Sequence, residues 1–216
     1  MKRVSGLAKQ AIAVAAFAVA AALSGGALHA QSIIDEWASV PAPPAPALKA
    51  AKLEPQTTAL LVLDLVKQGC NNERRPRCLA TIPKVEKLLA EFRAKNMMVV
   101  YSTYPSTKLE DTLPQVAPKG GEPSVNALAN KFVGTDLEKI LKDKGITTVV
   151  VVGAAAHGAV LYTGSDAAMR GFNVVVPVDG MSAESLYAEQ AAAWLLVNAP
   201  TVAQKVSLTR SDMITY

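Results

Sequence analysis

The hydrophobic positions of the chain fall into short unbroken apolar runs and longer segments with helical spacing. Two runs rich in β-branched residues, Thr147–Val152 and Phe172–Val178, lack polar alternation, which is typical of parallel strands buried on both faces. Between them, small residues open a segment whose apolar positions recur at helical spacing until Gly171, a residue type that commonly ends helices. This order predicts a βαβ unit, in which ligands bind at the carboxyl ends of the strands.

The same pattern predicts further elements on both sides of this unit. Strands are expected at Thr58–Asp64, Met97–Ser102 and Lys205–Leu208, and helices at Thr81–Lys95, Thr135–Lys144 and Ala183–Asn198. The segment Tyr104–Gly121 is polar and rich in proline, so we expect a loop over the carboxyl edge of the sheet. Strands that alternate with helices predict an α/β domain with a mostly parallel sheet.

The first 30 residues have the pattern of a secretory signal peptide. Basic residues precede the apolar run Ala11–Leu23, and small residues follow up to Ala30. The run is shorter than the roughly 20 residues that a membrane-spanning helix needs, so no stable membrane insertion is expected. The sequence therefore predicts a signal peptide at 1–30, a Pro/Ala-rich arm or linker at 31–56 and one domain at 57–216, in a periplasmic or secreted protein.

Charge gives no indication of a polyanionic partner. The predicted signal peptide holds three of the 22 Lys and Arg residues and none of the 18 Asp and Glu residues, which leaves 19 against 18. This balance argues against nucleic acid and anionic membrane surfaces as partners. A small molecule is the expected ligand, and a homo-oligomer that forms through the arm and the helix surfaces is the expected assembly.

The two cysteines, Cys70 and Cys78, are expected to form a disulfide because an exported protein meets an oxidising compartment. Their Cα atoms should then lie about 4.4–6.8 Å apart. The bridge would hold the short basic loop NNERRPR. The alternative is a reactive thiol just after the first strand.

Asp64 is the first candidate for chemistry, because it ends an otherwise apolar strand. A carboxylate is costly in such a place unless it has a function. The alternative is a structural aspartate that caps the following turn.

Four stretches together resemble the isochorismatase-like, or cysteine hydrolase, family, which includes nicotinamidases and isochorismatases. They are TALLVLD, KFVGTDLEKILKDKGITTVVVVG, GAAAHGAVLYTGSDAAMRGFNVVVPVD and the helix that follows. The resemblance extends from about Thr57 to the C-terminus, and it implies a three-layer, Rossmann-like fold with helices on both faces. It also implies a site made of an Asp at the end of the first strand, a Lys before F-x-G-T-x-L, and a Cys at the start of the central helix. Asp64 matches the first of these.

The other two positions depart from the family pattern. Counting back from Phe132 reaches Asn126 instead of Lys, and counting forward from the strand end reaches Ala159 instead of Cys. An alanine methyl cannot attack a carbonyl carbon, so a cysteine-type amidase mechanism is excluded. Lys131 either reaches the site by a different route or lies on the surface.

The stretch Ala156-His157-Gly158-Ala159 is similar to the isochorismatase branch, which has a small residue in place of the cysteine. That branch hydrolyses a vinyl ether with acid catalysis and water. The resemblance implies that Asp64 is the general acid or base. His157 either orients a substrate carboxylate or supplies a proton, or it packs at the start of the helix. Nicotinamidase-like members of the family carry an Asp and two His after the second strand, whereas the matching loop YSTYPSTKLED has no histidine, so no metal is expected. No cofactor is expected either.

The leading hypothesis is an exported non-thiol hydrolase for a small carboxylated or cyclic molecule. Asp64 would act as acid and base, Asn126 and Lys131 would orient the substrate, and the amides of Gly158 and Ala159 would hold an anionic group. Tyr104 and Tyr162 would line the pocket. The alternative is an inactive family member that serves as a periplasmic binding or scaffold protein.

Two geometric expectations follow from the resemblance. Asp64, Asn126 and Ala159 should face one pocket at the carboxyl edge of the sheet, with His157 and Lys131 at its rim. A cis peptide bond is expected between Ala155 and Ala156.

Overall fold

The computed structural model describes residues 32–216, which form two compact units. The first unit ends at Ala42, and its described part contains the short helix α1 (Ile33–Glu36). The second unit, Pro43–Tyr216, is the α/β domain. The predicted signal peptide lies outside the described residues. Among residues 32–216, no helix is long and apolar enough to cross a membrane.

The domain is built on a parallel sheet. Its strands lie in the order β4 (Ser124–Asn126), β3 (Met98–Thr103), β2 (Thr58–Leu63), β5 (Thr148–Ala154), β6 (Asn173–Pro177) and β8 (Val206–Thr209). The short strand β7 (Met181–Ser182) also pairs with β5, and every pair in the sheet is parallel. The predicted mostly parallel α/β fold is confirmed.

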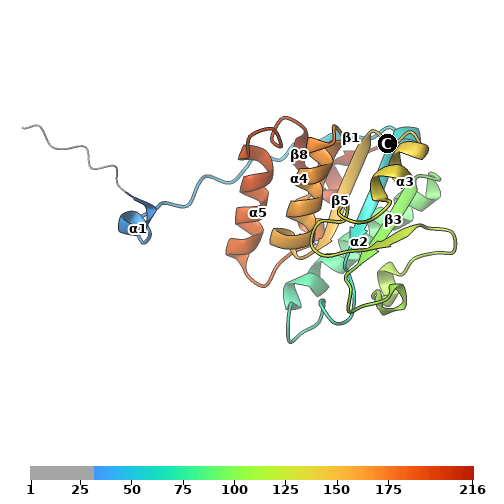
Figure 1. The fold of residues 1–216 in the computed structure, drawn as a ribbon, viewed down its shortest axis with the longest axis horizontal. Coiled ribbons are helices and arrows are strands. Elements are labelled where there is room, and N and C mark those ends of the chain that lie inside the picture. The colour runs from blue at the N-terminus through green and yellow to red at the C-terminus, as the bar shows by residue number, and fades with distance from the viewer. Residues whose placement is uncertain (1–31) are drawn as a thin grey trace, which may run out of the picture. The chain divides into compact units, whose positions relative to one another are not determined.

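Helices cover both faces of this sheet (Figure 1). One face packs against α2 (Pro76–Ala94), and the other packs against α3 (Leu137–Asp143), α4 (Leu161–Met169) and α5 (Leu186–Asn198). Each face has its own apolar core, since alternate residues of β2 point to opposite sides: Leu61 belongs to one core and Leu60 to the other. Burial on both sides explains why the strands read as unbroken apolar runs.

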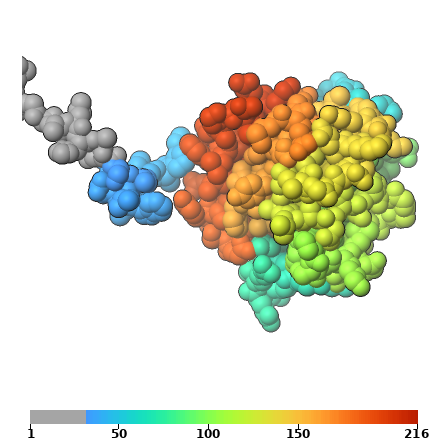
Figure 2. All heavy atoms as spheres, in the orientation of Figure 1, coloured from blue at the N-terminus to red at the C-terminus, as the bar shows by residue number. Residues whose placement is uncertain are grey.

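Short turns of helix connect these elements. A π-helical turn, Ala156–Val160, leads directly into α4. Turns of 3-10 helix lie at Pro55–Thr57, Leu109–Asp111, Pro114–Val116, Val178–Gly180 and Ser211–Met213. Figure 2 shows the segment between β3 and α3, coloured green to yellow, spread over the face in view. This is where the sequence predicted a long loop.

The second half of the predicted arm belongs to the domain. Strand β1 (Ala51–Lys52) pairs in parallel with β9 (Ile214–Thr215), which joins this segment to the C-terminus. Just before it, the Lys49 N–H donates to the Leu208 carbonyl over 2.8 Å, and the following Leu53 is only 2% exposed. From Lys49 onward, the chain is therefore fixed to the domain by hydrogen bonds and packing.

Candidate active site

Asp64 lies immediately after β2, at the carboxyl edge of the sheet and near its centre. It adopts a left-handed backbone conformation with φ 55°, which is uncommon for a residue other than glycine. Its N–H donates to the carbonyl of Ser102 at the end of β3. On the other side, β5 approaches so closely at Gly153 that a Cβ there would lie 2.0 Å from the Leu63 carbonyl oxygen. The two neighbouring strands thus fix the position of the Asp64 carboxyl group.

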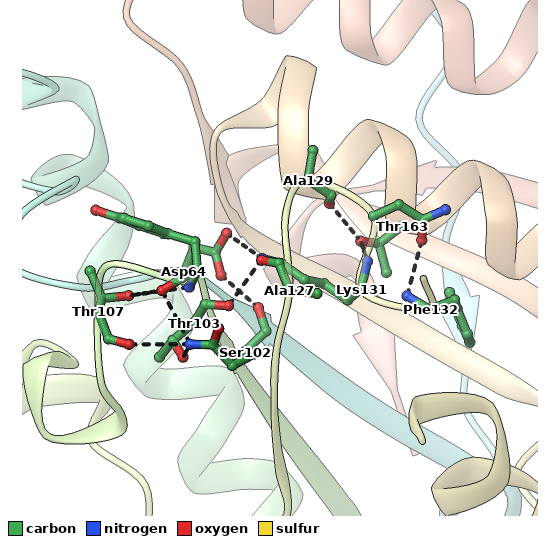
Figure 3. A network of polar contacts seen from close by, with 12 residues as sticks. Asp64, Ser102, Thr103, Thr107, Ala127, Ala129, Lys131, Phe132 and Thr163 are labelled. Atoms are coloured by element: carbon green, nitrogen blue, oxygen red, sulfur yellow. Dashed lines mark hydrogen bonds and ion pairs between the residues drawn. The ribbon is translucent and has the colours of Figure 1, made fainter. Parts of the chain in front are cut away.

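Lys131 lies behind Asp64 and is fully buried. Its Nζ is 2.7 Å from Asp64 Oδ2 and also donates to the carbonyl oxygens of Ala127 over 2.9 Å and Thr103 over 3.3 Å (Figure 3). An ammonium group has three N–H donors, so all of them have partners. Lys131 is therefore neither a surface residue nor at the rim of a pocket. Lys131 supplies the cation beside Asp64, although the family spacing placed that cation at position 126.

Ser102 completes the surroundings of the Asp64 carboxylate. Its hydroxyl donates to Asp64 Oδ1 over 2.8 Å, so each carboxylate oxygen accepts one hydrogen bond from the protein (Figure 3). Sequence reasoning missed this residue. The signal was available, because Ser102 is a polar residue at the end of the strand that neighbours β2.

The ionisation of this pair is governed by burial. Burial raises the pKa of Asp64 above its ordinary value of 3.8, although Lys131, Ser102 and Arg75 act in the opposite direction. Burial likewise lowers the pKa of Lys131, against the effect of the Asp64 charge. A carboxyl group with a raised pKa can both accept and donate a proton nearer to neutral pH, which general acid–base catalysis requires.

A cavity of about 220 Å³ lies over the Asp64 carboxyl group. Ala159, at the cysteine position of the family pattern, is in its wall, as is Tyr104, whose hydroxyl is buried without a hydrogen-bond partner among the described residues. The full lining is Asp64, Gly69, Arg74, Arg75, Tyr104, Leu128, Ala129, Ala154, Ala155 and Ala159. The structure thus brings Asp64, Ala159 and Tyr104 together.

Asn126 does not line this cavity, contrary to the expectation. Its side-chain amide donates to Thr103 Oγ1 over 2.7 Å and to the carbonyl oxygens of Tyr104 and Thr107, each over 3.1 Å. Asn126 therefore holds the loop that follows β3. The spacing argument was wrong here because the lysine is provided five residues later in the chain.

The structure also shows the contacts of three further predicted residues. The His157 side chain is 47% exposed, and its Nε2 lies 3.7 Å from Glu184 Oε2. The Gly158 N–H donates to the Ala155 carbonyl, so this amide already has an acceptor within the chain. Tyr162 is 55% exposed and lines a neighbouring apolar depression of about 280 Å³ with Leu128, Ala129, Asn130 and Val133, of which Leu128 and Ala129 also line the Asp64 cavity.

Two predictions concern the backbone and the cysteines. The cis peptide bond lies between Ala154 and Ala155, one residue before the predicted Ala155–Ala156 bond.

Cys70 and Cys78 form a disulfide with a Cα–Cα distance of 5.3 Å, as predicted. No free cysteine remains among residues 32–216, so the alternative of a reactive thiol does not apply.

The disulfide-closed loop contributes a residue that sequence reasoning left without a role. Arg75 is only 6% exposed, its Nη1 donates to the Gly69 carbonyl over 2.8 Å, and its Nη2 forms an ion pair with Glu184. Burial alone would raise the pKa of Glu184, but its hydrogen bonds and the charges of Arg75 and His157 hold that pKa below its ordinary value. The available signal was the basic composition of the loop between the two cysteines.

Residues 32–216 contain no cluster of three or more His, Cys, Asp or Glu side chains that could hold a metal ion. The ionisable side chains that line the cavity are those of Asp64, Arg74, Arg75 and Tyr104.

The isochorismatase domain model matches residues 58–205, which is more than half of the chain. The chain belongs to the isochorismatase family. It is 31% identical over 113 residues to a "Secreted isochorismatase effector Isc1" of Verticillium dahliae, covering 47% of this chain and 60% of that protein. It is also 31% identical over 124 residues to an "N-carbamoylsarcosine amidase" of Arthrobacter sp, covering 44% of this chain and 47% of the amidase. The chain thus spans about half the length of these curated relatives.

Solved structures of the family have the same fold. A crystal structure of an isochorismatase family protein from Desulfovibrio vulgaris matches with a TM-score of 0.66. The match covers 73% of this chain and 95% of that one, at 18% sequence identity. The family fold therefore accounts for the three-layer α/β architecture.

Proposed function

We propose that this chain is a hydrolase that acts on a small molecule, with water as the nucleophile and Asp64 as the general acid and base. The observation that carries the proposal is a buried carboxyl group, paired with Lys131, in the wall of a cavity whose cysteine position holds Ala159. The names of the two curated relatives, an isochorismatase and an amidase, support hydrolysis as the class of reaction.

In the proposed reaction, Asp64 accepts a proton from water while the water oxygen forms a bond to the electrophilic carbon of the substrate. The bond from that carbon to the leaving group then breaks, and Asp64 returns the proton to the leaving group. With an enol ether, protonated Asp64 first donates its proton to the terminal vinyl carbon. Water then adds to the oxocarbenium carbon while its proton returns to Asp64, and the adduct releases the alcohol. Lys131 is a positioning residue, because its three donors bind Asp64 and two carbonyl oxygens and none remains for a substrate. Ser102 fixes the other carboxylate oxygen in the same way.

The experiment is to incubate the purified chain with a panel of small amides, esters and enol ethers in H₂¹⁸O. Mass spectrometry would detect products that carry the heavy oxygen. Asp64→Asn should reduce turnover by about 100-fold or more, because the variant can no longer transfer the proton. Asp143→Asn, which removes an exposed carboxylate that pairs with Lys139, should retain full activity. Full activity in Asp64→Asn would refute the acid–base assignment.

A second candidate function is a periplasmic small-molecule binding or scaffold protein. The observation that favours it is Ala159, since the cavity wall has a methyl group at the position where the family pattern has the cysteine nucleophile. An enzyme needs the Asp64 carboxylate, whereas a binding protein would tolerate asparagine. No turnover across the panel, with equal ligand affinity in wild type and Asp64→Asn, would favour this function.

Export and self-association are parts of the same proposal. The disulfide and the word "Secreted" in the name of the Verticillium dahliae relative support an extracytoplasmic location. Fractionation of expressing cells tests the location, and light scattering on the purified chain tests the homo-oligomer.

A further inference from the structure

Arg75 combines burial with an unused hydrogen-bond donor. The residue lines the Asp64 cavity and is 6% exposed, yet its Nε has no partner among the described residues. The other two nitrogens bind the Gly69 carbonyl and Glu184. A buried donor without a partner is costly, and Arg75 is a residue of the cavity wall, so a ligand acceptor that reaches this nitrogen would remove the cost.

The loop that carries Arg75 is held in place from both ends. The Cys70–Cys78 disulfide closes it. Inside the loop, the side-chain oxygen of Asn71 accepts from the N–H of Arg74 over 2.8 Å, and the Asn71 carbonyl accepts from the N–H of Arg75 over 3.0 Å. The guanidinium group of Arg75 is therefore placed before any ligand arrives, which lowers the cost of binding.

The charges around the cavity favour an anion. Two negative groups are already matched, because Asp64 pairs with Lys131 and Glu184 pairs with Arg75. Arg74 also lines the cavity and has no ion pair within the described part of the chain. One positive charge is thus left over, which suits a ligand that carries a single negative charge.

A second unpartnered group lies close to Arg75. A Cβ built on Gly69 would be 3.5 Å from Arg75 Nη1 and 3.6 Å from the Tyr104 hydroxyl oxygen. Both groups therefore border the same space beside Gly69. An arginine offers parallel N–H donors that match the two oxygens of a planar carboxylate, and a tyrosine hydroxyl adds a third donor.

We propose that Arg75, Arg74 and the Tyr104 hydroxyl form a subsite for one carboxylate group of the substrate, on the wall made by the disulfide-closed loop. This deepens the proposed function, on which it rests for the idea that the bound molecule is a substrate. With the carboxylate at the loop, the opposite end of the molecule lies toward Asp64 and Ala159. Arg75 thus determines specificity, and Asp64 performs the chemistry.

Calorimetric titration of the full chain with benzoate, and with benzamide as its neutral counterpart, tests the subsite. Benzoate should bind at least about tenfold more tightly than benzamide, because charge-assisted hydrogen bonds contribute that much or more. Arg75→Lys keeps the charge but removes Nε and the planar fork, so benzoate should bind about tenfold more weakly. Arg74→Gln should weaken benzoate binding about threefold, since its side chain is exposed and its charge is screened.

Two variants separate the subsite from a merely structural role of the loop. Gly69→Val leaves every charge in place and fills the space beside Arg75, so benzoate binding should be lost while the melting temperature stays within a few degrees. Arg77→Gln removes a charge from the same loop, but Arg77 pairs with Glu189 and does not line the cavity, so affinity should not change.

Several outcomes would overturn the proposal. They are equal affinity for benzoate and benzamide, unchanged benzoate affinity in Arg75→Lys, and tighter binding of inorganic phosphate than of benzoate. Asp64→Asn distinguishes this failure from failure of the proposed function. Benzoate binding that persists in Asp64→Asn, in a chain that hydrolyses nothing, supports the subsite and refutes only the hydrolase. Turnover without benzoate binding refutes only the subsite.

Discussion

At the scale of single residues, Asp64 and Lys131 form an ion pair in which each charge depends on the other for its partner. Both side chains are almost completely buried, so removing one charge leaves the other without a partner in a poorly solvated place. Lys131→Met should lower the free energy of unfolding by about 3–5 kcal/mol. The double variant Lys131→Met/Asp64→Asn should recover more than half of this loss, measured by urea denaturation.

The control for that prediction is Lys142→Met. Lys142 is exposed and pairs with Glu138 one helical turn away, so this change should cost no more than about 0.5 kcal/mol. A double variant no more stable than Lys131→Met would show that the carbonyl contacts of Lys131, and not its charge, dominate.

The raised pKa of Asp64 predicts a pH dependence of stability. The folded protein holds this proton more tightly than the unfolded chain does, so the contribution of Asp64 to the free energy of unfolding falls as pH rises from 3.8 toward the raised value. Over that window, Asp64→Asn should lose less stability with rising pH than wild type does. Parallel urea denaturation curves of the two proteins at several pH values measure the difference.

Ala159 offers a direct test of the cavity. In Ala159→Cys, the new thiol should lie in the wall beside Asp64, with Lys131 already supplying the cation. Iodoacetamide should therefore label this variant under native conditions, as detected by intact mass, and wild type should stay unlabelled because its cysteines are paired. Asn126→Lys is not needed for this test, since Asn126 binds the loop after β3.

The sequence predicted the location of a site residue only where that residue directly follows a strand of the sheet. Asp64 ends a buried strand and the start of the central helix follows another, so both were placed at the correct edge of the sheet. Lys131 and Asn126 lie in an irregular segment between β3 and α3, where the direction of a side chain depends on loop contacts that spacing does not encode. Arg75 was missed because its partner Glu184 is 109 residues away in sequence.

At the scale of elements, the disulfide-closed loop joins stability to ligand binding. The bridge closes a short loop, so replacing both cysteines by serine should lower the free energy of unfolding by roughly 2–3 kcal/mol in the chain-entropy account. The variant should also bind benzoate more weakly, because the loop no longer holds Arg75 in place. Chemical denaturation and titration measure the two effects separately, and unchanged benzoate affinity would show that the Asn71 contacts suffice.

Helix boundaries were less predictable than helix positions. Helix α2 begins at Pro76, five residues before the predicted start, because proline suits the first turn of a helix, where its missing N–H is no loss. The central helix begins with a π-helical turn, which apolar periodicity does not reveal. By contrast, the strands followed from unbroken β-branched runs that only a sheet covered on both faces explains.

At the scale of the whole molecule, the N-terminal boundary of the domain is open to a truncation test. A chain that begins at Pro43 should unfold at the same urea concentration as one that begins at Gln31, because the compact unit starts there. A chain that begins at Gln56 loses the β1–β9 pairing and buried Leu53, and should unfold at a clearly lower concentration. Equal midpoints for all three chains would contradict the packing of this segment.

The global architecture was predictable because family motifs and apolar pattern agree along the chain. The association of residues 43–55 with the C-terminus was not, since a Pro/Ala segment has no periodicity that would identify its partner.

The arginines of the Cys70–Cys78 loop also give trypsin a cleavage site inside the disulfide ring. Arg74 is exposed, so trypsin can reach the bond after it, whereas the bond after Arg75 precedes Pro76 and resists cleavage. A cut at Arg74 falls inside the ring that the disulfide closes. The nicked chain should therefore run as a single band on a non-reducing gel and separate into two fragments once the bridge is reduced.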